Sequence, residues 1–201
     1  MSALPDPKRK WKEHRSRHGI QAKYIAMEIH LETERLILRQ FTLEDVDLLM
    51  ELDSDPEVTR YINGGKPPER DKAQDFVEFV ISGYAENPRQ GFFIALEKPT
   101  LEFIGWFHYR PDRRMTDHME IGYRLVKAAW GRGLATEGSK ALIEDGFSRG
   151  IHKVSGCTLK ANVPSQNVLR KIGLELVEEY DEQRVPMEDK SALLFARDFE
   201  A

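Results

Sequence analysis

The chain of 201 residues is 40% hydrophobic and carries a formal net charge of −4, which is enough for a single domain with a full core. No apolar run is long enough to imply a membrane-spanning helix. The single cysteine, Cys157, excludes an internal disulfide, and we expect it to be a buried, unreactive thiol in a reducing cytoplasm.

The charge is unevenly distributed. Residues 1–30 contain seven Lys/Arg and three Asp/Glu, a balance of +4, so residues 31–201 must carry −8 to give the total of −4. The run from Lys8 to Lys12 fits a nucleic-acid arm or a targeting segment, but no apolar signal core follows it. We expect residues 1–30 to form a solvated basic extension, free to be mobile, and residues 31–201 to form one domain. The acidic body argues against general nucleic-acid binding.

The first half of the chain predicts one strand followed by three helices, over residues 35–41, 42–52, 55–62 and 69–84. Acidic residues in the first turn of the 42–52 segment suit the positive end of a helix dipole. The second helix is stopped by Gly64 and Gly65. In the third helix we expect Phe76, Phe79 and Val80 to line one side.

The second half alternates strands with two helices. We expect strands over residues 92–96, 103–109, 119–125 and 152–160, helices over 134–147 and 162–172, and a terminal antiparallel pair over 175–180 and 193–198. Gly173 closes the last helix. Strands joined by hairpins with helices interspersed indicate a mixed α+β sheet.

The stretch from Met119 to Phe147 is the most informative. Apolar residues alternate with Glu120, Gly122 and Arg124, which is typical of a strand with two different faces. A glycine-containing turn follows and opens directly into a helix, whose first amides can bind an anion such as a diphosphate. An ordinary strand-to-helix turn fits the local pattern equally well. The stretch has neither the Gly-Lys-Ser/Thr of a P-loop nor the G-x-G-x-x-G spacing of a dinucleotide-binding fingerprint, so both of these phosphate sites are excluded.

The turn Trp130-Gly131-Arg132-Gly133-Leu134-Ala135 resembles the acetyl-CoA-binding motif R/Q-x-x-G-x-G/A of the GNAT acyltransferase superfamily, with Trp130 at the first position. Three further blocks resemble the RimJ/RimL-like branch, which acetylates the N-termini of ribosomal proteins. They cover residues 34–39, 55–58 and 162–174, in the family's order and at its spacing. The resemblance extends over about residues 32–199.

The resemblance implies the GNAT fold: a central mixed, mostly antiparallel sheet with splayed parallel strands at the cofactor site and helices on both faces. It also implies transfer of an acetyl group from acetyl-CoA to a primary amine, by direct attack and without a metal. A protein N-terminal α-amine is the expected acceptor. A small-molecule amine (polyamine, amino acid or antibiotic) and a non-catalytic acyl-CoA-binding module are the alternatives. A monomer or a homodimer is compatible with the family.

The candidates for catalysis are Glu120 and Ser165. Glu120 can act as the base, directly or through water, or it can pair with Arg124 or bind the acceptor cation. His118 is the reserve base because its free pKa lies near neutrality. Many members have a tyrosine, seven positions after the motif asparagine, that protonates the thiolate, but Leu169 stands there. Ser165 can instead hydrogen-bond the sulfur, or it can simply cap the helix.

The remaining site residues follow from the resemblance. The acceptor pocket is expected near Tyr61, Trp106, His108, Tyr109 and His118. The expected cofactor contacts are backbone groups of Leu125 and Val126 for the pantetheine; Gly131, Arg132, Gly133, Leu134, Ala135 and Thr136 for the diphosphate; Trp130 by stacking, unless it is a core aromatic; Asn162 for the pantetheine amides; and Asn167 and Arg170 for the distal half, unless they are solvated helix residues.

Overall fold

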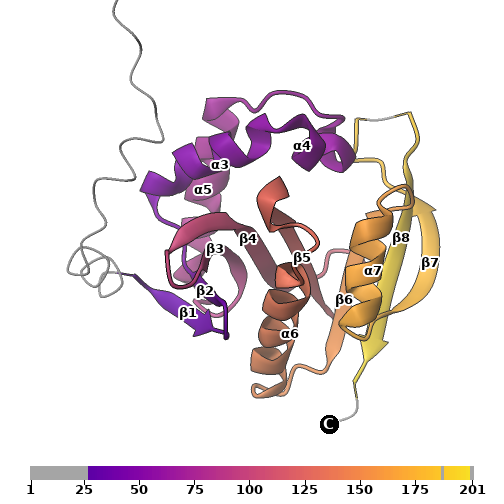
Figure 1. The fold of residues 1–201 in the computed structure, drawn as a ribbon. Helices are drawn as coiled ribbons and strands as arrows, with labels where there is room; N and C mark the ends of the chain where they lie inside the picture. The colour runs from indigo at the N-terminus through magenta and orange to yellow at the C-terminus, as the bar shows by residue number, and fades with distance from the viewer. Residues whose placement is uncertain (1–26, 187, 200–201) are drawn as a thin grey trace, which may run out of the picture.

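A computed structural model of the chain describes residues 27–186 and 188–199. These residues form an eight-stranded sheet in the order β1-β2-β3-β4-β5-β6-β8-β7 (Figure 1). The strands are β1 Ile29–Glu32, β2 Leu36–Arg39, β3 Gly91–Glu97, β4 Glu102–Pro111, β5 Met119–Leu125, β6 Lys153–Leu159, β7 Glu175–Asp181 and β8 Ser191–Asp198. The predicted basic run lies outside the described residues. Strand β1, which we did not predict, begins within the range expected to be an extension.

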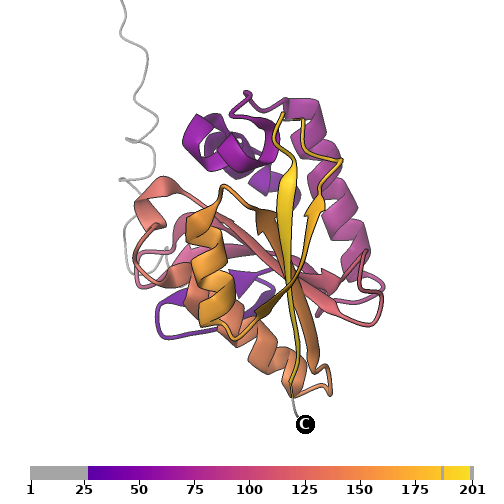
Figure 2. The same ribbon diagram turned by 90° about the vertical axis from the view of Figure 1, so that its right-hand side faces the viewer.

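The helices cover both faces of this sheet (Figures 1 and 2). They are η1 Leu43–Asp45, α3 Val46–Ser54, α4 Pro56–Asn63, α5 Arg70–Tyr84, η2 Lys127–Ala129, α6 Leu134–Phe147 and α7 Val163–Lys171. Helices α3 and α5 pack on β4 and β3, α6 packs on β1, β2, β4 and β5, and α7 packs on β6. Because both faces are covered, three successive residues of β2, Leu36 to Leu38, are all buried.

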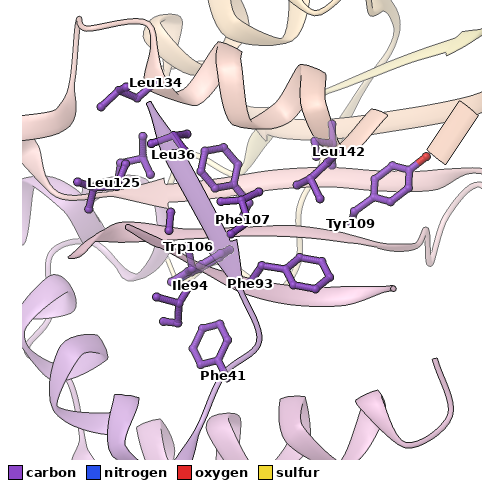
Figure 3. Close-up of a cluster of buried hydrophobic side chains, with 14 of the residues drawn as sticks. Leu36, Phe41, Phe93, Ile94, Trp106, Phe107, Tyr109, Leu125, Leu134 and Leu142 are labelled. Atoms are coloured by element: carbon purple, nitrogen blue, oxygen red, sulfur yellow. The ribbon is translucent and has the colours of Figure 1, made fainter. Parts of the chain in front are cut away.

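Successive residues of β4 point to opposite faces of the sheet. Phe107 and Tyr109 lie beneath α6, where Gly138 and Gly146 leave room for their rings; a Cβ at Gly138 would lie 2.5 Å from Phe107 Cζ. Figure 3 shows both rings on the side of Leu142 of α6. The prediction that Tyr109 borders the acceptor pocket is therefore wrong, because its position in the strand turns it to the α6 face.

Helix α5 matches its predicted range, but its inward face differs from the prediction. Val77, Val80 and Tyr84 are buried, whereas Phe79 is 61% exposed. Phe76 lies on the inward side, with its ring edge-on to Phe92 at 5.0 Å between centroids. Burial thus follows the spacing i, i+3, i+7 that begins at Val77, and this spacing leaves Phe79 in solvent.

The sheet opens between β5 and β6. The strands are parallel, and within the described residues only Met119↔Val154 and Glu120↔Ser155 pair across them. All other neighbouring strands are antiparallel. β5 continues to Leu125 and β6 to Leu159, so their carboxyl ends leave a gap in the sheet. The predicted mixed, mostly antiparallel sheet with splayed parallel strands is confirmed.

Candidate active site

A cleft of about 1240 Å³ is centred on this gap. Its lining includes residues of α4, α5 and α7 and the N-terminal turn of α6. The predicted site residues that line it are Tyr61, Trp106, His108, Glu120, Leu125, Trp130, Gly131, Gly133, Leu134, Ala135, Thr136, Asn162, Ser165 and Asn167. The structure therefore brings residues from five separate stretches of the chain to one continuous surface.

The turn before α6 is built from two glycines in the left-handed region, with φ of +71° at Gly131 and +80° at Gly133. A Cβ at Gly131 would meet nothing within 4 Å, so the glycines are required by backbone conformation more than by local crowding. Among the described residues, nothing accepts a hydrogen bond from the amides of Leu134, Ala135 or Thr136. These donors and the helix dipole make this end of the cleft suited to an anion.

An ion-pair network holds the turn against the start of β2. Glu137, in the first turn of α6, accepts hydrogen bonds from Thr33 Oγ1 at 2.5 Å and from Arg35 N at 2.9 Å and Nε at 2.6 Å. Arg35 Nη1 also donates to the carbonyl of Arg132 at 2.9 Å. Burial acts to raise the pKa of Glu137, but these bonds outweigh it and lower the pKa. Arg35, part of a motif block, thus anchors the turn.

Three predicted cofactor residues do not reach the cleft. The Arg132 guanidinium forms a two-pronged pair with Glu97 on the surface, so its side chain does not face the predicted diphosphate site. The Val126 amide donates to Ile104 O at 2.9 Å and its carbonyl accepts from Ala129, which leaves no backbone donor for pantetheine. Arg170 lies over the ring of Phe195, at 5.3 Å from the centroid.

Besides Ser165, the residues of α7 that line the cleft are Pro164, Asn167, Val168 and Lys171. Their i, i+3, i+4, i+7 spacing, which helical periodicity alone could have identified, places Lys171 where Arg170 was predicted. Lys171 has no acidic partner among the described residues, so its ammonium group is available to an anion in the cleft.

Trp130 is 46% exposed and lines the cleft, so it is not a core aromatic. Its Nε1 donates to the carbonyl of Leu125 at 2.9 Å. This bond fixes the indole at the carboxyl end of β5 and occupies the carbonyl that we had expected to face the pantetheine. A carbonyl oxygen has two lone pairs, so a second donor remains possible there.

Glu120 lies on the polar face of β5 and is paired with a residue we did not predict. Its cation partner is Arg110, which faces it across the β4–β5 ladder. Arg124, the expected partner, instead binds Asp53 at 2.6 Å. Cys157 Sγ lies 3.4 Å from Glu120 Oε1, and burial followed by this carboxylate raises the pKa of Cys157 to about 12. The cysteine is therefore a neutral thiol, but it is only partly buried and lines the cleft, whereas we expected it to be buried.

His108 is mostly withdrawn from solvent beside Glu120, with a side chain 12% exposed and Nε2 at 3.8 Å from Oε2. Its ring lies over Gly122, where any Cβ would overlap the imidazole, and it stacks on Trp106 at 6.0 Å. Burial, and then Arg110 and Arg124, hold the pKa of His108 well below its usual value of 6.5. The imidazole is therefore neutral at physiological pH.

His118 does not belong to the cleft. Its backbone amide bonds to Met115 within the turn before β5, and its Nδ1 and Nε2 contact Asp117 at 2.8 Å and Asp198 at 3.1 Å. The alternation that would place it beside Glu120 does not apply, because β5 begins only at Met119. The structure thus rejects His118 as a reserve base and as an acceptor contact.

Ser165 is positioned by two neighbours. Asn162, not Ser165, is the N-cap of α7, and its Oδ1 accepts from Ser165 N at 3.3 Å. Tyr123 lies 3.1 Å from Ser165 Oγ through its hydroxyl, and burial raises the pKa of Tyr123 to about 12. Tyr123 was missed because its place in β5 marked it only as an inward apolar position. Leu169 is buried against Gly156 and cannot take part.

The β7–β8 hairpin adds a wall that we did not predict. The residues of this hairpin that line the cleft are Tyr180, Glu182, Arg184, Val185 and Pro186. These residues lie in a terminal segment with no recognisable motif, and only the antiparallel return of β8 beside β6 brings the hairpin to the gap.

A sheet that opens between parallel strands next to an uncapped helix N-terminus is the arrangement that the GNAT resemblance predicts for the cofactor site. The family model described as an acetyltransferase (GNAT) domain matches residues 35–175. The chain belongs to the GNAT family and is an acetyl-CoA-dependent N-acetyltransferase, as predicted.

Two curated proteins and one solved structure are similar to the chain. An uncharacterised N-acetyltransferase, p20, of Bacillus licheniformis is 32% identical, over 77% of this chain and 88% of its own. The FsC-acetyl coenzyme A-N(2)-transacetylase of Aspergillus fumigatus is 30% identical, over 75% and 66%. The structure of RimL, a ribosomal L7/L12 alpha-N-protein acetyltransferase, in complex with coenzyme A shares the fold at a TM-score of 0.71, with 18% identity over 86% and 98%. No helix among the described residues is long and apolar enough to cross a membrane.

Proposed function

We propose that this enzyme acetylates the α-amine of a peptide or protein N-terminus by direct attack on acetyl-CoA in a ternary complex. The observation that supports this proposal is the continuity of the cleft. One surface joins the free amides at the start of α6, the Ser165 hydroxyl and Glu120 through the gap between β5 and β6. Both substrates can therefore be bound at once, and no covalent enzyme intermediate is required.

In the proposed reaction the α6 amides and Lys171 bind the phosphates, and the thioester lies in the gap. The amine loses a proton, towards Glu120 directly or through a water, and attacks the carbonyl carbon. The tetrahedral intermediate collapses with departure of the thiolate, next to the Ser165 hydroxyl. Because Tyr123 retains its proton, it can donate to Ser165 Oγ and leave the serine O–H free to donate to the departing sulfur.

The charges in the cleft favour a single amine over a polyamine. Every carboxylate of the described residues that lines the cleft already has a cationic partner: Asp53 with Arg124, Glu57 with Lys127, Glu69 with Lys72, Glu120 with Arg110, and Glu182 with Arg184. A polycation therefore finds no unpaired carboxylate for its second charge. A neutral peptide chain attached to a single amine has no second positive charge, so it requires no further carboxylate.

The test is release of free thiol from acetyl-CoA with a panel of acceptors: a peptide with a free N-terminus, the same peptide N-acetylated, and spermidine. We expect thiol release with the free peptide only. Greater kcat/KM for spermidine would refute the choice of acceptor. A thermal shift with acetyl-CoA, but no thiol release with any amine, would favour the non-catalytic module.

The role of Glu120 is tested by Glu120→Gln. An N-terminal amine is mostly protonated below about pH 8, so a base is needed most in that range. We expect the variant to lose activity chiefly below about pH 8, with a smaller loss above it. Glu178→Gln, which removes an exposed carboxylate paired with Arg114 outside the cleft, is the matched control. A pH–rate profile of Glu120→Gln parallel to that of the control would remove Glu120 from this role.

A further inference from the structure

The lining of the cleft near Glu120 includes a set of apolar side chains from α4, α5, β3 and β4. The set, which we call the apolar wall, is Val58, Ile62, Ala73, Phe76, Phe92 and Trp106. Phe92 packs edge-on to Trp106, at 5.4 Å between ring centroids. Ile62 is 36% exposed. The three side chains that α5 and β3 contribute are also only partly buried, so the wall presents carbon surface to the cleft.

The ring nitrogens beside this wall do not reach the surface of the cleft. Nε1 of Trp106 and both ring nitrogens of His108 are fully withdrawn from solvent. The His108 ring extends the wall, since it lies edge-on to Phe92 at 5.1 Å between centroids. Whatever surface these two rings present to the cleft is therefore carbon. A hydroxyl placed against them would lose its bonds to water without gaining a partner.

The wall extends to the proposed base. Ile62, Trp106 and Glu120 all line a cavity of about 190 Å³ that adjoins the cleft. A group attached next to an amine at Glu120 therefore lies against the wall. The carboxylates in α3 and at the start of α5 are already paired, Asp53 with Arg124 and Glu69 with Lys72. An apolar group covers this surface most favourably, because it displaces water and leaves no charge or hydrogen bond unmatched.

We propose that the apolar wall binds a large apolar group carried by the carbon next to the reactive amine of the acceptor. This inference rests on the proposed function, and it narrows the acceptor by its first side chain. The preferred peptide begins with an aromatic or branched aliphatic residue, such as phenylalanine or leucine. A peptide that begins with alanine leaves the wall in contact with water, and one that begins with serine buries a hydroxyl against carbon.

A panel of acceptors that differ only in this group tests the proposal. It consists of four peptides identical except for a first residue of phenylalanine, leucine, alanine or serine, together with phenethylamine and ethylamine. Rates of thiol release are expressed per concentration of unprotonated amine, so that differences in amine pKa do not enter. We expect kcat/KM for the phenylalanine and leucine peptides to exceed that for the alanine peptide by at least about tenfold. The serine peptide should be no better than the alanine peptide, and phenethylamine should exceed ethylamine.

The variant Ile62→Ser removes apolar surface from the wall at a partly exposed position, where the fold depends little on the side chain. We expect it to lower the ratio of phenylalanine-peptide to alanine-peptide kcat/KM by about three- to fivefold. Leu43→Ser is the matched control, because Leu43 is also an exposed aliphatic residue, 62% exposed, but does not line the cleft. The control should keep the wild-type ratio.

The outcomes separate this inference from the proposed function. Equal kcat/KM for the phenylalanine and alanine peptides, or preference for the serine peptide, would overturn the role of the wall while acetyl transfer stood. A wild-type ratio in Ile62→Ser would overturn it as well. Preference for phenethylamine over ethylamine, without thiol release from any peptide, would support the wall and refute the N-terminal acceptor. Absence of thiol release with every amine would refute the proposed function and this inference together.

Discussion

Replacing Gly133 with alanine tests whether the left-handed turn presents the α6 amides to the cofactor. Gly133 has φ of +80° and ψ of 1°, a conformation that costs a residue with a Cβ about 1–2 kcal/mol. The Cβ itself has room, since its nearest neighbour would be Arg35 Nη2 at 3.6 Å. The cost of the substitution is therefore backbone strain and not a clash.

This strain can be relieved only by moving the turn, which displaces the amides of Leu134 to Thr136 from the cleft. If 1–2 kcal/mol of binding energy is lost, the Kd for acetyl-CoA rises about 5- to 30-fold. The matched control is Gly150→Ala. Gly150 has φ of +77°, a Cβ there meets nothing within 4 Å, and the residue lies between α6 and β6, away from the cleft.

Titration calorimetry with acetyl-CoA measures the change in cofactor affinity, and urea unfolding measures the change in stability, for both variants. We expect a similar loss of unfolding free energy in both, and weaker binding in Gly133→Ala only. Wild-type affinity in Gly133→Ala, despite the same loss of stability, would show that the turn does not hold the diphosphate.

Two further predictions concern groups away from the turn. Tyr123→Phe should lower kcat about two- to tenfold with little change in the KM for acetyl-CoA, because the hydroxyl acts through Ser165; steady-state kinetics with unchanged kcat would contradict this. His30 stacks on Phe93 at 4.1 Å, and burial lowers its pKa from 6.5 to about 4. Between pH 6.5 and pH 4 the unfolded chain binds a proton at His30 that the folded chain does not. The free energy of unfolding is therefore unaffected by His30 titration above pH 6.5 and falls by up to about 3 kcal/mol towards pH 4. In denaturant unfolding at pH 7, 5.5 and 4, the unfolding free energy of His30→Phe should depend less steeply on pH than that of the wild type. The same slope in both would show that His30 is not the titrating group.

Much of the fold could be predicted because it depends on local patterns. The alternation of Met119 to Leu125 predicted a strand, and the change of period after Gly133 predicted a helix, since these periods follow from backbone geometry alone. The glycines of the turn are likewise a local requirement, because a positive φ excludes most other residues. The same locality explains why the motif blocks sufficed to indicate the family.

The side-chain partners in the site depend on contacts between distant segments. Sequence periodicity placed Glu120 and Arg124 on one face of β5, but the register of β4 brought Arg110 to Glu120, and α3 brought Asp53 to Arg124. From the sequence, Arg132 was predicted to bind a phosphate, but in the fold it pairs with Glu97 of β3.

The sequence by itself determined which elements form, which face of each is apolar, and where the backbone must turn. Only the tertiary structure decided which charges neutralise one another and which donors are left without partners. The physical reason is range: backbone propensity acts over a few residues, whereas hydrogen bonds and ion pairs act between any groups that folding brings within a few ångströms.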